Sequence, residues 1–303
     1  TIIPVDQDTR LDLIRKEYPV LLDFQPEWSR HVTHELDLFL SERTQLSHLT
    51  EAGLRPSRSM LFYGLPGTGK TLAARMLAST LNLPLLTLDL SSVMSSFLGR
   101  TGVNIRRVLE YAKDVDCVLL LDELDAIAKR RDDATEIGEL KRLVTVLLQE
   151  IDLWPDSGIL IAATNHSELL DPAVWRRFDR TIEFPLPSQP DIEKFLIHDL
   201  DDQINHEMIN VVSHLLDGQS YSDIVRLLSQ AKKYAVLQRL SLEEAIWLHT
   251  QSFMETLPRV TRKKIALHLS KNGYNDTKVS KLLCMSRDTV RKIRTERGQR
   301  SKL

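Results

Sequence analysis

Residues 64–71 constrain the fold of this chain most, because their pattern requires a strand before them and a helix after them. They read G-L-P-G-T-G-K-T, which matches the G-x-x-x-x-G-K-T pattern of a phosphate-binding loop. The apolar run 59–63 precedes the pattern, and a helical pattern over 72–78 follows it. In such a loop, glycines let backbone N–H groups turn inward around phosphate oxygens, and the helix N-terminus adds partial positive charge.

The loop therefore predicts a nucleotide site that also takes Mg²⁺. Lys70 is expected to reach the β- and γ-phosphates of ATP, and the Thr71 hydroxyl is expected to hold the metal. The residues expected to contact the nucleotide here are Gly64, Pro66, Gly67, Thr68, Gly69, Lys70, Thr71 and Leu72.

A second motif, V-L-L-L-D-E at 118–123, ends in two acidic residues. Its continuous apolar run is typical of a strand buried on both faces, and open α/β sheets bind ligands at the carboxyl ends of their strands. We expect Asp122 to hold Mg²⁺ through water and Glu123 to polarise the attacking water as general base. The alternative is an ordinary strand ending in a helix-capping Asp, and the phosphate loop favours the catalytic interpretation.

Two further segments carry candidate catalytic residues. Asn165 follows the apolar run 158–161 and Ala162-Ala163-Thr164, where it could orient the water. Arg176 and Arg177 lie within D-P-A-V-W-R-R-F-D-R at 171–180. An arginine pair at a helix end is by default a solvated surface, but in an assembly it could reach a neighbour's γ-phosphate as an arginine finger.

Together these segments resemble the AAA clade of the AAA+ ATPase superfamily, over roughly residues 20–257. The segments that carry the resemblance are GLPGTGKT, LLLDELDAI, ATN and DPAVWRRFDRTIEFPLP. The adjacent arginines resemble those of katanin- and spastin-like proteins, whereas FtsH-like unfoldases, which the chain resembles overall, space them by two residues. The resemblance implies an Mg²⁺-dependent ATPase that works as a ring, most often a hexamer, with each site between two subunits.

The resemblance also implies roles for two other segments. Residues 95–99 resemble the first pore loop, whose aromatic residue grips a threaded polypeptide, and Phe97 occupies that position. The family's preceding Lys is Ser96 here, and its following Glu is Arg100. Residues 218–224 resemble the lid motif G-x-S-x-x-D-I, which places Gly218 and Ser220 near the adenine; Ser220 or Ser222 would also cap a helix.

The expected fold is an α/β P-loop AAA+ core with a parallel sheet, an α-helical lid and a small basic three-helix C-terminal domain. The expected domains are an N-terminal extension at 1–25 with a partly helical pattern, the large nucleotide-binding domain at 26–187, the lid at 188–257 and the basic domain at 258–303. Within the large domain we expect helices at 27–49, 103–112 and 139–151, and strands at 83–90, 117–121, 159–163 and 181–184. The remaining helices are expected at 191–200, 207–216, 221–237, 242–255, 263–269, 276–283 and 287–297.

Charge is distributed unevenly along the chain. Residues 258–303 hold 14 Lys and Arg against three Asp and Glu, a net charge of +11, while the rest of the chain carries −13. Such asymmetry is typical of a nucleic-acid-binding appendage on an acidic core. The segment resembles a helix-turn-helix, although a small basic bundle that docks on protein is the alternative.

Residues in this segment divide into two groups. Those expected to face DNA are Arg287, Thr289, Arg291, Lys292 and Arg294. Those expected to pack the helices together are Val279, Leu282, Leu283, Val290 and Ile293, with Ser286 as the cap of the last helix.

Composition narrows the setting. No apolar run approaches the roughly 20 residues of a membrane span, so we expect no membrane partner. The two cysteines, Cys117 and Cys284, make a disulfide framework implausible and fit a cytoplasmic protein.

Three uses of the ATPase remain open from sequence. The ring could thread and remodel a protein, with the C-terminal segment recruiting it to DNA, which is the preferred hypothesis. It could instead be a DNA-dependent ATPase or regulator, as in transposition, replication or anti-phage defence. It could also be an ATP-switched scaffold that activates a partner enzyme.

Overall fold

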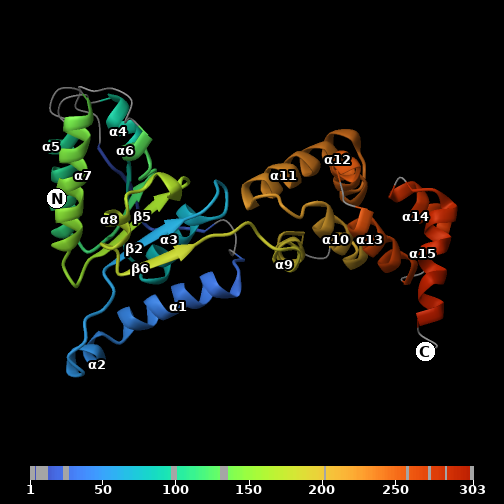
Figure 1. The fold of residues 1–303 in the computed structure, drawn as a ribbon, viewed down its shortest axis with the longest axis horizontal. Coiled ribbons are helices and arrows are strands. Elements are labelled where there is room, and N and C mark those ends of the chain that lie inside the picture. Colours follow the sequence, from blue (N-terminus) through green and yellow to red (C-terminus); the bar gives the residue numbers. More distant parts are fainter. Residues whose placement is uncertain are drawn as a thin grey trace. The chain divides into compact units, whose positions relative to one another are not determined.

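The computed structural model describes residues 4, 13–22, 27–96, 101–129, 136–200, 203–256, 259–271, 274–283 and 285–300. The chain divides into two compact units, Thr1–Leu186 and Pro187–Leu303 (Figure 1). The first contains the sheet, and the described part of the second is helical.

A six-stranded sheet forms the centre of the first unit, in the order β1-β3-β4-β5-β2-β6. All neighbouring strands run parallel except β1, which pairs antiparallel with β3. The strands are β1 Arg15–Glu17, β2 Ser59–Tyr63, β3 Leu85–Asp89, β4 Val118–Asp122, β5 Ile159–Thr164 and β6 Arg180–Glu183. The α/β class and the parallel core predicted from the alternation of elements are confirmed.

Helices cover both faces of this sheet. The helices of the first unit are α1 Arg30–Thr44, α2 Leu46–Glu51, α3 Lys70–Thr80, α4 Leu90–Ser96, α5 Thr101–Lys113, α6 Ala126–Lys129, α7 Glu136–Asp152 and α8 Pro172–Trp175, with a 3₁₀ turn at Ser167–Leu169. Leu119 and Leu121 of β4 pack on one side with α5 and α7, while Val118 and Leu120 pack on the other with α1 and α3. A strand with both faces covered must be apolar throughout, which explains the uninterrupted run before Asp122.

The N-terminal segment differs from its prediction. Residues 1–25 were expected to be partly helical, but Arg15–Glu17 forms the edge strand β1. Its partners are Leu85, Leu86 and Thr87 of β3. A three-residue charged strand has no apolar period, so its position depends on the pairing with β3, on the ion pair of Glu17 with Arg75 at 2.7 Å, and on the buried Leu13 and Ile14 before it.

The first predicted helix is also interrupted. We expected one helix over 27–49, whereas α1 ends at Thr44 and α2 begins at Leu46. Gln45 has φ −116° and ψ 33°, outside the helical region, and this residue separates the two helices.

The second unit contains seven helices in its described part. They are α9 Gln189–Leu200, α10 His206–Leu215, α11 Tyr221–Gln238, α12 Leu242–Thr256, α13 Arg259–Lys271, α14 Asp276–Leu282 and α15 Arg287–Arg300. Ser286 caps α15, because its Oγ accepts a hydrogen bond from the Thr289 amide at 3.2 Å, as predicted.

The last three helices share a core with α10. Val211 and Leu215 of α10 cluster with residues of α13, α14 and α15. Of the packing residues predicted for this segment, the buried ones are Val279, Leu283, Val290 and Ile293, and the Leu282 side chain lies outside the described residues. The basic C-terminal segment is therefore joined to the preceding helices through an apolar interface. Among the described helices of the whole chain, none has the length and apolar character needed to cross a membrane.

Candidate nucleotide-hydrolysis site

The phosphate loop connects β2 to α3, and its first and last glycines are each required. Gly64 and Gly69 have φ of 142° and 99°, which residues with a Cβ rarely adopt. A Cβ on Gly64 would collide with the Phe184 carbonyl, and a Cβ on Gly69 would lie 2.7 Å from Trp28 Nε1. The loop is therefore closely packed against its own domain and preformed for a ligand. Of the other predicted contacts, Pro66 is exposed in the loop and Leu72 is half-buried on α3.

The Lys70 side chain lies across the phosphate loop, where it is predicted to bind the phosphates of the nucleotide. Its Nζ donates to the carbonyls of Gly64 and Leu65 at 2.8 and 2.9 Å, and Thr68 Oγ1 donates to the Leu65 carbonyl at 2.9 Å. The side chain is 6% exposed. Burial lowers the pKa of Lys70 to about 8, although the negative charges of Asp122 and Asp125 act in the opposite direction.

This lowered pKa predicts that nucleotide affinity decreases with pH. Below pH 8 the free protein holds Lys70 as an ammonium, which polyphosphate prefers, and above it the charge is lost. If only the ammonium form binds, the Kd for ATP should rise about tenfold between pH 7 and pH 9. Titrations at fixed ionic strength measure this, and Lys70→Arg, which keeps its charge, is the control. An equal rise in the control would assign the effect to another group.

Thr71 and Asp122 come together as the predicted metal site requires. Thr71 lies in the first turn of α3, and its Oγ1 lies 3.2 Å from Oδ2 of Asp122 at the end of β4. Burial raises the pKa of Asp122, while hydrogen bonds from the Glu123 amide and Thr71 lower it. A hydroxyl and a carboxylate are oxygen ligands of the kind that Mg²⁺ binds beside phosphates, so these residues fit the ion. When bound there, Mg²⁺ would neutralise charge on the phosphates.

Glu123 lies on a strained turn directly after β4. Its φ is 55°, in the left-handed region, and its amide donates to Asp122 Oδ1 at 3.0 Å. The next amide, that of Leu124, donates to the Ala163 carbonyl of β5 at 2.9 Å, which fixes the turn. The Glu123 side chain is exposed. A strained backbone of this kind persists where the surrounding structure enforces it. Here the turn exposes the Glu123 carboxylate to solvent at the carboxyl ends of the strands, where the phosphate loop also lies.

Asn165 follows β5, between β4 and β2 in the sheet, and a residue that was not predicted holds it there. Asp125 is 2% exposed, and its Oδ1 accepts hydrogen bonds from Thr164 Oγ1 at 2.9 Å and from the Asn165 amide at 3.2 Å. The only sequence signal was the third acid of L-D-E-L-D, the second Asp of that run, and no apolar-strand pattern marks its role. Asp125 thereby connects the segment after β4 to the segment after β5.

The two arginines lie away from the phosphate loop. Arg176 is exposed at the C-terminal end of α8, and Arg177 forms an ion pair with Asp152 at the end of α7. Asp179, two residues later, bonds to Ser59, the first residue of β2, whereas the phosphate loop follows the last residue of β2. The segment is thus held at the amino-terminal edge of the sheet, and Ser59 is about 16 Å from Gly64 along β2 at about 3.3 Å per residue.

Other predicted site residues lie apart from this cluster. Phe97 falls outside the described residues. Gly218 and Ser220 belong to the second unit, where Gly218 has φ 86° and Ser220 caps α11 by accepting from the Asp223 amide at 3.2 Å. The predicted cap is confirmed, and a contact of either residue with adenine stays a prediction.

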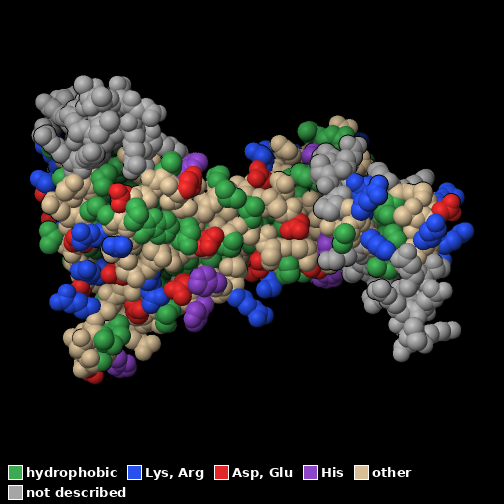
Figure 2. All heavy atoms as spheres, in the orientation of Figure 1, with side chains coloured by type: hydrophobic (Ala, Val, Ile, Leu, Met, Phe, Trp, Pro, Cys, Tyr) green, Lys and Arg blue, Asp and Glu red, His purple; other side chains and the backbone are tan. Residues whose placement is uncertain are grey.

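The candidate DNA-facing residues lie on α15, and several have protein partners. Arg287, Arg291, Lys292 and Arg294 are all exposed. Asp276 of α14 lies 2.9 Å from Arg294 and 3.9 Å from Arg291, and the Thr289 hydroxyl contacts Ser286. Figure 2 shows Lys and Arg side chains over these helices on the visible face.

A parallel sheet with a phosphate loop after β2 and an Asp-Glu pair at the end of β4, one strand away across β5, defines a P-loop nucleotide-hydrolysis domain. Comparison with known proteins agrees with this class. Residues 60–186 match the model of the ATPase family associated with various cellular activities (AAA). The chain belongs to the AAA+ ATPase superfamily and carries its ATP-hydrolysing domain.

Three relatives illustrate the similarity. An uncharacterized AAA family ATPase, y4kL, of Sinorhizobium fredii is 39% identical over 206 residues, 66% of this chain and 61% of the relative. The proteasome-activating nucleotidase of Methanococcus vannielii is 33% identical over 224 residues, 71% of this chain and 53% of the relative. That of Archaeoglobus fulgidus is 30% identical over 266 residues, 81% and 66% respectively. The chain thus spans between half and two thirds of the length of these relatives.

Proposed function

We propose that the protein is an Mg²⁺-dependent ATPase that works as a homo-oligomeric ring, most often a hexamer in this superfamily, and remodels or threads a protein. Its C-terminal helices would recruit it to DNA. A cytoplasmic setting is part of the proposal, since Cys117 is a buried free thiol.

The observation that carries the ring is the separation of the arginine pair from the phosphate loop of the same domain. Arg177 is held by Asp152 at one edge of the sheet, while Lys70 and Glu123 lie at the other. An arginine that stabilises the transferred phosphoryl group must contact it. Arg176 and Arg177 would therefore serve the nucleotide of an adjacent subunit, which requires an assembly.

Action on a protein is supported by two other observations. Several relatives are named proteasome-activating nucleotidases, and the action in that name is on a proteasome. Phe97 occupies the aromatic position of the pore loop that the sequence resembles. Recruitment to DNA is supported by the net charge of +11 on residues 258–303 and by the exposed cations of α15.

ATP turnover at constant salt tests the proposal, measured alone, with an unfolded polypeptide and with double-stranded DNA. We expect polypeptide to stimulate turnover and Phe97→Ala to abolish that stimulation while DNA binding is retained. Stimulation by DNA alone that Phe97→Ala leaves unchanged would favour a DNA-dependent ATPase instead. No stimulation by either would favour an ATP-switched scaffold for a partner enzyme.

DNA binding has its own test in the double variant Arg291→Ala, Lys292→Ala. Losing two phosphate contacts should weaken binding and reduce the slope of log K against log salt by roughly two. The matched control is Lys194→Ala, Lys233→Ala, which removes two exposed cations from α9 and α11. Equal loss in both variants would indicate a general charge effect and contradict recruitment through α15.

A further inference from the structure

Asp179 attaches the segment that contains Arg176 and Arg177, here called the arginine segment, to the residues at the start of β2. It directly follows Arg176-Arg177-Phe178, and its Oδ2 accepts from the amides of Arg58 and Ser59 at 2.7 and 3.0 Å. Ser59 Oγ donates to the same oxygen at 3.1 Å and accepts from the Asp179 amide at 3.0 Å. Ser59 is 3% exposed, so these bonds form a partly buried and reciprocal joint.

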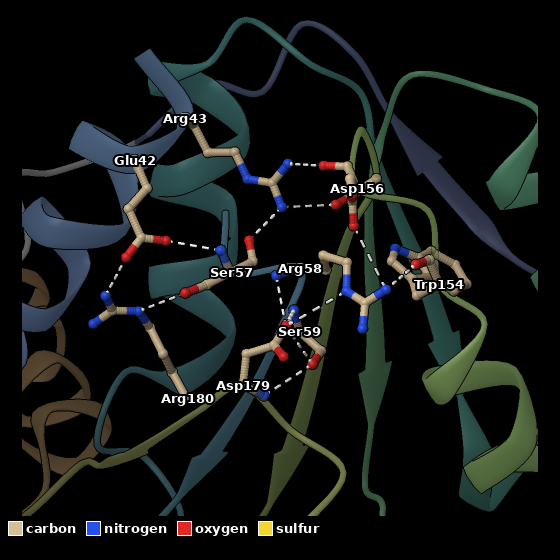
Figure 3. A network of polar contacts seen from close by, with 10 residues as sticks. Glu42, Arg43, Ser57, Arg58, Ser59, Trp154, Asp156, Asp179 and Arg180 are labelled. Carbon is tan, nitrogen blue, oxygen red and sulfur yellow. Dashed lines mark hydrogen bonds and ion pairs between the residues drawn. The ribbon is translucent and has the colours of Figure 1, made fainter. Parts of the chain in front are cut away.

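A wider network holds this joint in place (Figure 3). Arg180 lies 2.8 Å from Glu35, forms a second ion pair with Glu42, and donates to Ser57 Oγ at 3.0 Å. Glu35 and Glu42 belong to α1, so the residue after Asp179 is fixed to a helix that packs on the sheet.

The other side of the joint is fixed by Arg58. Its guanidinium donates to the Trp154 carbonyl at 2.8 Å and lies 3.6 Å from Asp156 and 3.9 Å from Asp179. Trp154 is 1% exposed and belongs to the core, so this contact ties the joint to a rigid part of the domain. Arg58 and Ser59, whose amides bind Asp179, therefore lie in a backbone segment that is held on both sides.

The strands that leave this joint lead to the phosphate loop. β6 runs parallel to β2, with Met60 opposite Arg180 and Tyr63 opposite Glu183. At the far end, the Phe184 amide donates to the Tyr63 carbonyl at 2.7 Å, and the Phe184 carbonyl packs against Gly64. One pair of strands therefore connects the arginine segment at one edge to the first loop glycine at the other.

We propose that Asp179 is a positioning residue for the arginine pair. By holding its segment to Ser59, it fixes where Arg176 and Arg177 project from the domain, and hence whether they reach the phosphate of an adjacent subunit. Asp179 acts through the arginines and does not itself contact nucleotide. The proposal rests on the trans role of the arginine pair proposed above.

Asp179→Ala should therefore impair turnover without impairing nucleotide binding. A displacement of about 1 Å in a group that acts on the transition state can cost about 10²-fold, so we expect a loss of kcat on that order with KM nearly unchanged. Asp179→Asn retains an oxygen that can accept the same three hydrogen bonds, and it should recover most of the lost rate. Glu244→Ala is the matched control, because Oε2 of Glu244 on α12 accepts similar bonds from the amide and hydroxyl of Ser241, which precedes the helix.

Mixed rings separate a positioning role from damage to the domain's own site. Asp179→Ala subunits keep their phosphate loop, and Lys70→Ala subunits keep their arginine pair. A mixture should turn over ATP faster than the sum of the two measured apart, because some intact loops then face intact arginines. The same mixture made with Arg176→Ala, Arg177→Ala in place of Asp179→Ala tests the trans role itself.

The outcomes are distinct. Recovery in both mixtures supports the positioning role. Recovery with the double arginine variant but not with Asp179→Ala would overturn it, as would wild-type turnover of Asp179→Ala. No recovery with the double arginine variant would overturn the trans role. If Asp179→Ala does not fold, judged by its thermal unfolding, Ser59→Ala removes the partner hydroxyl and is carried through the same mixtures.

Discussion

Glu123→Gln is expected to bind ATP with nearly unchanged affinity and to hydrolyse it about 10²–10⁴-fold more slowly, the range that a positioned general base contributes. The amide of Gln has nearly the same shape as the carboxylate but cannot accept a proton from water. Glu123 is exposed at the end of β4, and the contacts of Lys70, Thr71 and Asp122 do not depend on its charge.

The measurement is single-turnover hydrolysis beside equilibrium binding of ATP. Glu110→Gln serves as the control, because Glu110 is an exposed glutamate on α5 outside the site. Turnover of Glu123→Gln near the wild-type rate would remove Glu123 from the role of base. Loss of binding together with turnover would point to a collapse of the strained turn at φ 55°.

The double variant Arg176→Ala, Arg177→Ala should lose about 10³–10⁵-fold in turnover, which is the range reported for an arginine finger. ATP binding should persist, because the phosphate loop of each subunit lies at the opposite edge of its own sheet. The Arg177–Asp152 ion pair is no obstacle to a role in trans, since exposed pairs of this kind contribute only about 0–1 kcal/mol.

Dilution gives an independent measure of the same dependence on assembly. Specific activity of the wild-type protein should decrease as the ring dissociates, while that of the double variant stays low at every concentration. Arg30→Ala, Arg55→Ala removes two exposed arginines of the same unit and should behave as wild type. Full activity in a sample shown to be monomeric would refute a trans arginine.

The sequence predicted those parts of the site whose roles are encoded locally. The phosphate loop requires glycines at fixed spacing, and a doubly covered strand such as β4 requires an uninterrupted apolar run, so both are visible in a single segment. Asp122 and Thr71 are 51 residues apart, yet each lies in its own motif, and the fold brings them to 3.2 Å.

What escaped prediction depends on partners far along the chain. Asp125 and Asp179 act through hydrogen bonds to residues 39 and 120 positions away, and nothing in the sequence next to an acid indicates such a distant partner. β1 escaped because its three residues are charged, and the partners that place it, β3 and Arg75, lie far along the chain. The packing of α10 against α13–α15 escaped because apolar periodicity marks a buried face without naming what covers it.

That last contact limits how the basic segment can be studied on its own. Truncating the chain before Arg259 would remove Ile265 and Leu269, which pack against Val211 and Leu215. The truncation would therefore expose an apolar patch on α10. Any change measured in a truncated chain could therefore arise from association through this apolar patch, and would not by itself test the proposed binding of nucleic acid. For the same reason, a chimera that carries residues 259–300 on another helical unit would need an apolar face equivalent to that of α10.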